Sequence, residues 1–175
     1  MVDATLIAAP SSTPNQKKER DPEMHQTRKG NPWYFGMQAH LGTDRDSKLV
    51  QTVVVTAANV ADATQTAELL HGEETQMHAD AGYTGVDKRP VIVALARKID
   101  WQIARKRGSI KTMAEAAEKL KAAVRAFVEH PFRMVKNLFG HRKVRCRGLA
   151  KNGHQRYTLF GLANVVIGGR TVAAA

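Results

Sequence analysis

The chain has 175 residues, of which 43% are hydrophobic and 25% are charged, a composition typical of one soluble globular domain. Its longest apolar stretches, such as residues 91–96, are too short to span a bilayer. The single cysteine, Cys146, excludes an intrachain disulfide framework and a paired-cysteine zinc site. The first residues lack the basic and apolar regions of a signal peptide, so we expect a cytoplasmic protein.

The net charge of +11 is distributed unevenly along the chain. Residues 1–100 carry 11 Lys and Arg against 13 Asp and Glu, whereas residues 101–175 carry 16 against 3. A solubilising surface needs a net charge of only about 2–8 on a small domain, usually with mixed signs. The strongly positive second half therefore indicates a polyanionic partner, and nucleic acid is the partner that we favour.

Alternating and β-branched residues predict five short strands. In chain order these are residues 2–8, 33–41, 49–56, 76–81 and 99–104. The second and third strands are joined by a short turn and predict an antiparallel hairpin. Residues 11–32 are polar, basic and rich in turn residues, which predicts a loop of about 20 residues; loops of that length are usually functional or mobile.

Helical spacing of apolar residues predicts four helices. In chain order these are residues 59–71, with Asn59 or Asp62 as the cap, 87–98, 113–139 and 155–167. Pro131 lacks a backbone donor and predicts a kink or a restart in the third helix. Residues 141–147 are basic and predicted to be extended. This order of elements predicts one α/β domain over residues 1–170, a mixed sheet flanked by helices, with a disordered tail at 171–175.

Three acidic residues occupy informative positions. Asp3 lies inside an apolar strand, Asp80 ends a strand, and Glu129 lies on the long predicted helix in a stretch with few acids. Carboxylates are rarely buried without a partner or a metal, and three of them converging at one sheet edge would suit Mg²⁺ or Mn²⁺. Each residue also has a purely structural explanation. Asp3 would be solvated, Asp80 would start an Asx turn, and Glu129 would pair with Arg125 on the helix surface. Spacing alone leaves both interpretations open.

Several segments of the sequence resemble the bacterial insertion-sequence transposases of the DDE type. The block of the first catalytic Asp is matched by residues 3–12, which begin Asp-Ala-Thr-Leu-Ile. Residues 21–31 and 35–40 resemble the first block as well, and residues 79–85, Ala-Asp-Ala-Gly-Tyr-Thr-Gly, resemble the second Asp block. Residues 125–132 resemble the Glu block. The resemblance covers roughly residues 1–165, with the blocks in the expected order.

The Glu block of this family often has the pattern Tyr-x2-Arg-x3-Glu-x6-Lys. Arg125, Glu129 and Lys136 match this pattern, whereas Ala122 stands at the position of the Tyr. Offsets of four and seven residues put Arg125 and Lys136 on the helix face of Glu129. Such a face would present one metal ligand flanked by two cations that can bind phosphate.

The resemblance implies a ribonuclease-H-like fold that cuts and rejoins DNA with two Mg²⁺ or Mn²⁺ ions. Asp3, Asp80 and Glu129 would hold the ions, and the partners would be the element ends, the target DNA and a second copy of the chain. Neither a membrane nor a small-molecule substrate is expected, and the protein would associate with the nucleoid. Basic residues expected to contact DNA backbone are Arg125, Lys136, Arg28, Lys29, Arg105, Lys106, Arg107, Arg142, Lys143, Arg145 and Arg147.

In the family, the first Asp lies well inside the full protein, after a region that recognises element ends. Only Met1 and Val2 precede Asp3 in this sequence. We therefore expect a catalytic-domain fragment without that region, and its own activity stays open. The alternatives are a non-catalytic DNA-binding remnant and a nuclease of the same fold without strand transfer.

The charge distribution predicts a DNA affinity that falls steeply with salt, because each bound phosphate releases counterions. For about six phosphate contacts, raising salt from 50 to 200 mM lowers the affinity by about 10³-fold. Fluorescence anisotropy with a labelled duplex measures this dependence. An affinity that hardly changes with salt would contradict the prediction.

Overall fold

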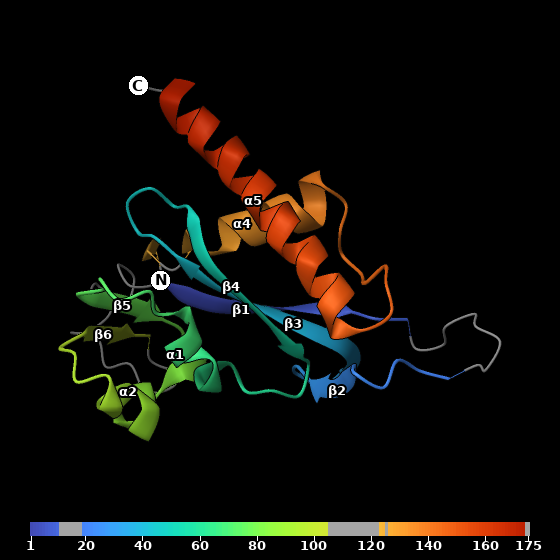
Figure 1. The fold of residues 1–175 in the computed structure, drawn as a ribbon, viewed down its shortest axis with the longest axis horizontal. Helices are drawn as coiled ribbons and strands as arrows, with labels where there is room; N and C mark the ends of the chain where they lie inside the picture. The colour runs from blue at the N-terminus through green and yellow to red at the C-terminus, as the bar shows by residue number, and fades with distance from the viewer. Residues whose placement is uncertain (11–18, 105–122, 125, 174–175) are drawn as a thin grey trace.

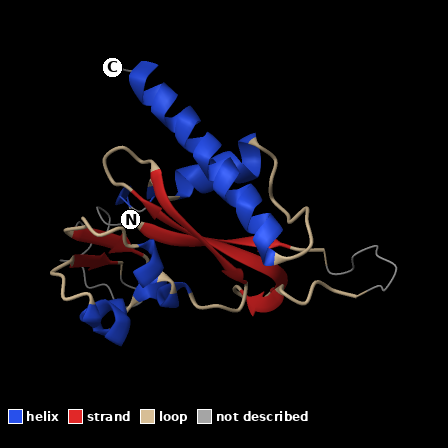
Figure 2. Cartoon of the chain, viewed as in Figure 1, coloured by secondary structure: helices blue, strands red, loops and turns tan. Residues whose placement is uncertain are grey.

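The computed structural model describes residues 1–10, 19–104, 123–124 and 126–173. They form a mixed α/β fold in which a twisted sheet lies between helices (Figures 1 and 2). Within the described residues, no helix is both long enough and apolar enough to cross a bilayer.

The larger sheet is built around one long strand, β3 (Trp33–Thr43). β1 (Val2–Ala8) and β4 (Val50–Ala57) pair antiparallel with it along opposite edges, and β2 (His25–Arg28) pairs with its first residues. The expected strands and hairpin are therefore found. The predicted loop at 11–32 is wrong in part, because β2 adds four residues of strand to the sheet.

A second, two-stranded sheet continues the arrangement beside β1. β5 (Gln76–Ala79) and β6 (Asp100–Ile103) are parallel, and β5 contacts β1 (Figure 1). Val2 of β1 packs with Met77 and Ala79 of β5 in one apolar cluster. The end of β5 is thereby held next to the start of β1.

The two faces of the larger sheet bury different apolar clusters. Met37, Ala39 and Leu41 of β3 belong to the cluster that includes α4 (Glu129–Arg133) and α5 (Leu149–Ala173). Val2 belongs to the smaller cluster with α1 (Thr66–Leu69) and β5. Ile7 of β1 belongs to the first cluster, so β1 contributes to both clusters, because residues an odd number of positions apart on a strand point to opposite faces.

Two predicted helices are much shorter than their sequence patterns indicate. Residues 59–71 contain a 3₁₀ turn at Asp62–Thr64 and the single turn of α1. Residues 87–98 contain only α2 (Pro90–Ala94) after a 3₁₀ turn. Pro90 occupies the first helical position, where its missing N–H costs nothing, and Ala96 has a φ of 50° that ends the helix.

The long predicted helix at 113–139 is interrupted before the expected proline. Residues 105–122 and 125 lie outside the described residues, and a turn at 127–128 precedes α4. Pro131 therefore lies in the first turn of α4, where helical N–H groups have no partners. A π-helical turn, Met134–Leu138, continues from α4. The predicted restart is therefore found, two residues before Pro131.

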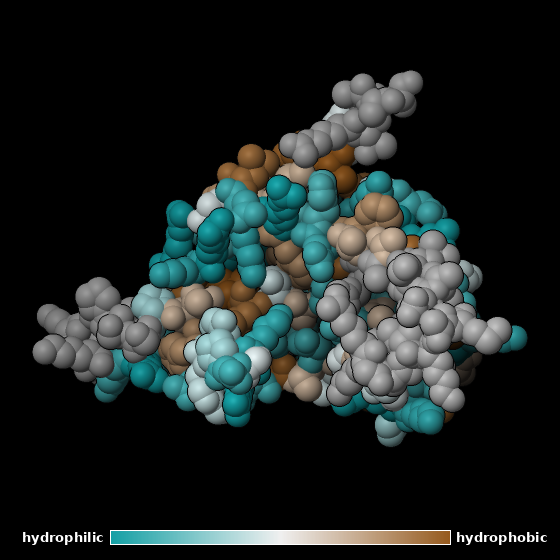
Figure 3. Space-filling model, turned by 180° about the vertical axis from the view of Figure 1, so that it is seen from behind, coloured by the Kyte–Doolittle hydropathy of each residue, from teal (hydrophilic) through white to brown (hydrophobic). Residues whose placement is uncertain are grey.

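The last helix is longer than predicted. α5 runs from Leu149 to Ala173 rather than from 155 to 167. Its C-terminal part extends beyond the sheet (Figure 1), and Figure 3 shows apolar residues along that part. Leu162 and Val165 are among its exposed apolar side chains, and Val165 is 71% exposed.

Replacing Gly36 with Ala tests the close approach of β1 to β3. A Cβ at Gly36 would lie 2.2 Å from the carbonyl oxygen of Ile7, so the two backbones would have to separate. We expect a loss of about 3 kcal/mol in unfolding free energy, or roughly 10 °C in Tm. Gly161→Ala on α5, where a Cβ meets nothing within 4 Å, is the matched control for thermal denaturation. Equal melting temperatures for the two variants would contradict this packing.

Candidate functional site

One cavity brings together carboxylates that are far apart in the sequence. Its volume is about 370 Å³, and it contains Asp3 from β1, Asp80 from the end of β5 and Glu129 from the start of α4. We call it the carboxylate cavity. Its complete lining is Asp3, Ala4, Thr5, Lys29, Asp80, Glu129, Phe132, Arg133, Lys136 and Asn137.

The backbone fixes both aspartates locally. Asp80 Oδ1 accepts a hydrogen bond from the backbone N–H of Gly82 at 2.8 Å and caps the 3₁₀ turn Ala81–Tyr83. Asp3 Oδ1 accepts from the backbone N–H of Ala4 at 2.7 Å. The Asx interpretation of Asp80 is therefore correct, and it is compatible with a place in the cavity.

Helix α4 brings Glu129 and the cation Arg133 to the same cavity. The helix is anchored by Phe132, which is buried and packs edge-on against Phe160 of α5 with ring centroids 6.0 Å apart. Glu129 and Arg133, four residues apart, share a helix face, and both line the cavity. Arg133 is a cavity residue that the sequence analysis missed, although its spacing from Glu129 was visible in the sequence.

Lys136 links the π-helical turn to strand β1. Its Nζ donates a hydrogen bond to Thr5 Oγ1 at 2.6 Å. Burial lowers the pKa of Lys136, and the positive charges of Lys29, Arg156 and Arg142 lower it further. Lys29 also lines the cavity, so cations surround the three carboxylates on several sides.

The donor chemistry of the cavity fits a divalent cation. Hard oxygen ligands are those that Mg²⁺ and Mn²⁺ prefer, and three carboxylates line the same space. As they stand, however, the His, Cys, Asp and Glu side chains of the described residues form no group of three that could hold a metal ion. Closure of the carboxylates around an ion would therefore require side-chain movement.

The basic segment at residues 141–147 is held next to the cavity. Arg142 donates to the carbonyl oxygen of Lys136 at 3.2 Å and to Asn137 Oδ1 at 2.7 Å, and both of these residues line the cavity. The backbone N–H of Val144 donates to the carbonyl oxygen of Ala8 at 3.0 Å. The predicted extended segment is therefore anchored to the end of β1, although only a single bridge forms there.

Two buried polar residues of α5 fix the backbone of this segment, and the sequence analysis missed both. Arg156, which has no exposed surface, donates to the carbonyl oxygens of His141 and Lys143 at 3.0 and 3.1 Å. Asn152 accepts from the backbone N–H groups of Arg145 and Cys146 and donates to the carbonyl of Cys146. The exposed side chains of Arg142, Lys143, Arg145 and Arg147 are thus carried on an ordered backbone.

Of the other basic residues predicted to contact DNA, Arg28 lies on β2, and several more lie outside the described residues. Arg28 ends β2 and pairs in register with Trp33, whose side chain is 65% exposed. Arg105, Lys106, Arg107, Arg125 and Ala122 lie outside the described residues.

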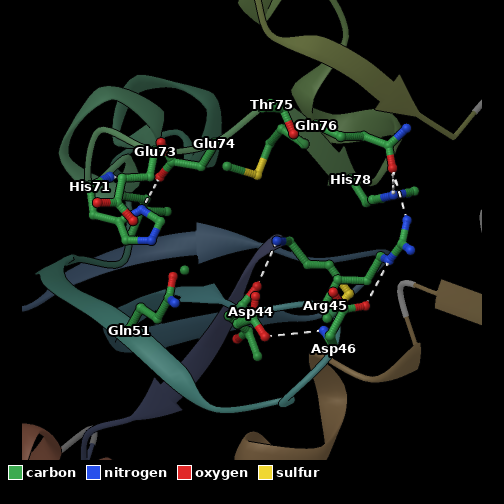
Figure 4. A pocket seen from close by; sticks show the side chains of 15 residues that line it. Asp44, Arg45, Asp46, Gln51, His71, Glu73, Glu74, Thr75, Gln76 and His78 are labelled. Carbon is green, nitrogen blue, oxygen red and sulfur yellow. Dashed lines mark hydrogen bonds and ion pairs between the residues drawn. The ribbon is translucent and has the colours of Figure 1, made fainter.

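A second cavity, of about 390 Å³, lies between the turn after β3 and the segment that leads into β5 (Figure 4). It is acidic, because its lining includes Asp44, Asp46, Glu73 and Glu74. Its polar groups are bonded largely to one another: Glu74 contacts His71 and Arg97, and Gln76 bonds to Arg45 and His78. His78, two residues before Asp80 on β5, lines this second cavity and is absent from the lining of the carboxylate cavity.

A family model described as a transposase DDE domain matches residues 1–165. No solved structure matches the chain.

The contact between Gly82 and Asp80 predicts that Gly82→Ala weakens cation binding without unfolding the domain. A Cβ at Gly82 would lie 2.9 Å from Asp80 Oδ1, so the carboxylate would have to turn away. We expect the Mn²⁺ affinity, measured by calorimetry, to fall by about tenfold, or 1.4 kcal/mol. The matched control is Gly168→Ala, where a Cβ meets nothing within 4 Å. An unchanged affinity for Gly82→Ala would show that this carboxylate does not bind the ion.

Proposed function

The chain belongs to the transposase DDE domain family, and we propose that it is the catalytic domain of a metal-dependent enzyme that cuts and joins DNA. The observation that carries this proposal is the carboxylate cavity. Asp3, Asp80 and Glu129, distant in sequence, line one space together with Lys29 and Lys136. Carboxylates for metal ions and cations for phosphate are the two kinds of group that phosphoryl transfer requires.

The strand arrangement supports a ribonuclease-H-like fold as part of the proposal. β4, β3 and β1 are antiparallel neighbours, β5 lies beside β1, and β6 runs parallel to β5. Helices α4 and α5 cover one face of the larger sheet. In this arrangement Asp3 comes from β1, Asp80 from the end of the neighbouring strand β5, and Glu129 from the covering helix α4.

We propose that Asp3, Asp80 and Glu129 hold two divalent ions, Mg²⁺ or Mn²⁺. Bound ions of this kind lower the pKa of an attacking water and stabilise the leaving oxygen in an in-line displacement. The carboxylates would turn toward the ions from their present positions, with the bond from the Gly82 N–H orienting Asp80. After cleavage, the same groups would serve the attack of the freed 3′-hydroxyl on target DNA.

The cations of the cavity would neutralise the DNA phosphate at the reacting bond. Lys136 is held by Thr5, so it reaches the cavity at little further cost in side-chain entropy. Arg133 and Lys29 would act from the other walls. Arg125, which matches the Arg of the family's Glu block, would add a further cation to this set.

DNA flanking the reacting bond would follow the basic segment that Arg156 and Asn152 hold in place. The contacts that we propose for this DNA backbone are Arg28, Arg142, Lys143, Arg145 and Arg147, together with Arg105, Lys106 and Arg107 outside the described residues. Trp33, exposed beside Arg28, could stack on a base. Association as a homodimer with element ends and target DNA, and a location at the nucleoid, remain predictions from the family resemblance.

One observation favours a second candidate function, non-catalytic DNA binding. The described carboxylates do not form a group of three that could hold a metal ion as they stand. A protein that cannot close them would still bind DNA through its basic segment. Mg²⁺ or Mn²⁺ would then neither raise its Tm nor promote nicking, whereas a metal-binding enzyme is stabilised by its ion.

Asp80→Asn tests the enzymatic proposal. The substitution keeps the side-chain shape but removes a charged oxygen ligand, so we expect Mn²⁺ affinity and nicking of supercoiled plasmid to fall more than about 100-fold, beyond the loss for a supporting residue. The matched control, Asp87→Asn, makes the same charge change at an exposed residue seven positions later and should leave both unchanged.

The proposal fails if Asp80→Asn binds Mn²⁺ and nicks DNA as well as the unsubstituted chain does. Transfer of a labelled donor end into plasmid DNA then separates a transposase from a plain nuclease, because only the transposase joins the two molecules.

A further inference from the structure

Tyr83 is a buried tyrosine whose hydroxyl has no hydrogen-bond partner among the described residues. It follows Asp80 by three residues in the 3₁₀ turn, and its backbone N–H donates to the carbonyl oxygen of Asp80 at 3.1 Å. The side chain has no exposed surface, and it packs with Val2, Leu69 and Met77. The ring thus has a packing role, but that role does not account for the hydroxyl.

The packing of the ring places Tyr83 beside the two strands that carry the cavity aspartates. Tyr83 shares its apolar cluster with Val2, which precedes Asp3 on β1, and with Ala79, which precedes Asp80 at the end of β5. Burial is the largest cause of a raised pKa at Tyr83, followed by the negative charges of Asp62, Asp3 and Asp80. The hydroxyl therefore keeps its proton at neutral pH and remains a donor. Asp3 and Asp80 are the two cavity residues that come from the paired strands β1 and β5.

Asp62, the third of these aspartates, has polar neighbours of its own on β3. Gln38, with its amide turned so that the nitrogen faces acceptors, donates to Asp62 Oδ1 at 3.3 Å. His40 Nδ1 lies 3.7 Å from the same oxygen, and His40 Nε2 bonds to Thr56 Oγ1 at 2.8 Å. Burial lowers the pKa of His40 to about 4, so this ring is neutral at pH 7 and does not cancel the charge of Asp62.

A buried donor without an acceptor lowers the stability of the fold. Phenylalanine would fill the same space at position 83 without that cost. The hydroxyl is therefore a donor without an acceptor, on a side chain whose neighbours in the apolar cluster directly precede Asp3 and Asp80 in the sequence. Outer hydrogen bonds of this kind orient the carboxylates that bind metals.

We propose that Tyr83 is a positioning residue of the carboxylate cavity, and that its hydroxyl donates to Asp3 or Asp80 when a divalent cation draws these carboxylates together. The inference rests on the proposed function, because it needs a cation in the cavity. It adds a residue that the three-carboxylate pattern does not include. The hydroxyl would contribute to cation affinity and not to the stability of the metal-free fold.

Tyr83→Phe tests this inference, because it removes only the hydroxyl. The measurements are the Tm of the metal-free chain and the Mn²⁺ affinity by calorimetry. We expect the Tm to stay the same or rise, since a buried unsatisfied group is lost, while the Mn²⁺ affinity falls about tenfold. The matched control is Tyr157→Phe on α5, where the tyrosine is exposed and both values should be unchanged.

Two results would overturn the inference alone. An Mn²⁺ affinity equal to that of the unsubstituted chain would show that the hydroxyl does not position a ligand. A clear fall in the metal-free Tm would show that the hydroxyl already has a stabilising partner. Asp80→Asn, measured in parallel, identifies failure of the proposed function itself: if the unsubstituted chain and Asp80→Asn bind Mn²⁺ alike, both proposals are wrong.

Discussion

The position of β1 between β3 and β5 is the constraint on which the carboxylate cavity depends. Seven residues of β1 pair with β3, and Gly36 allows the two backbones to approach closely. On its other side, Val2 packs against β5, so the end of that strand and Asp80 lie near Asp3. The contact of Phe132 with Phe160 then sets α4, and with it Glu129, over the same edge. Each carboxylate is therefore placed by the packing of apolar residues near it in the fold.

The charges around the cavity explain how a strongly basic chain can hold an acidic site. Carboxylates that are close together repel one another, which raises the free energy of the closed arrangement when no ion is bound. Lys29, Arg133 and Lys136 reduce this repulsion, and the same cations can bind the phosphate of a substrate. Arg156 and Asn152 contribute by ordering the backbone of the basic segment, so that its side chains lie beside the cavity before DNA arrives. One connected set of contacts would thus serve both the proposed cation binding and the proposed DNA binding.

The strands could be predicted from the sequence because each has a run of alternating or β-branched residues, and the three carboxylates could be singled out because each interrupts an apolar or basic context. The helices were predicted less well. At residues 87–98 the apolar spacing suits a helix, but Pro90 and the positive φ of Ala96 leave only one turn and a half. Arg156 and Tyr83 could not be assigned from sequence, because their roles depend on carbonyls and carboxylates brought near by tertiary packing. Strand β2 was hidden by its polar composition, which resembles a loop.

The most direct test of the central claim is a crystal structure of the chain grown with Mn²⁺, in which anomalous scattering locates the metal. The account predicts Mn²⁺ in the carboxylate cavity, with oxygens of Asp3, Asp80 and Glu129 as ligands. Metal found only elsewhere, or the three side chains directed away from one another at saturating Mn²⁺, would contradict it.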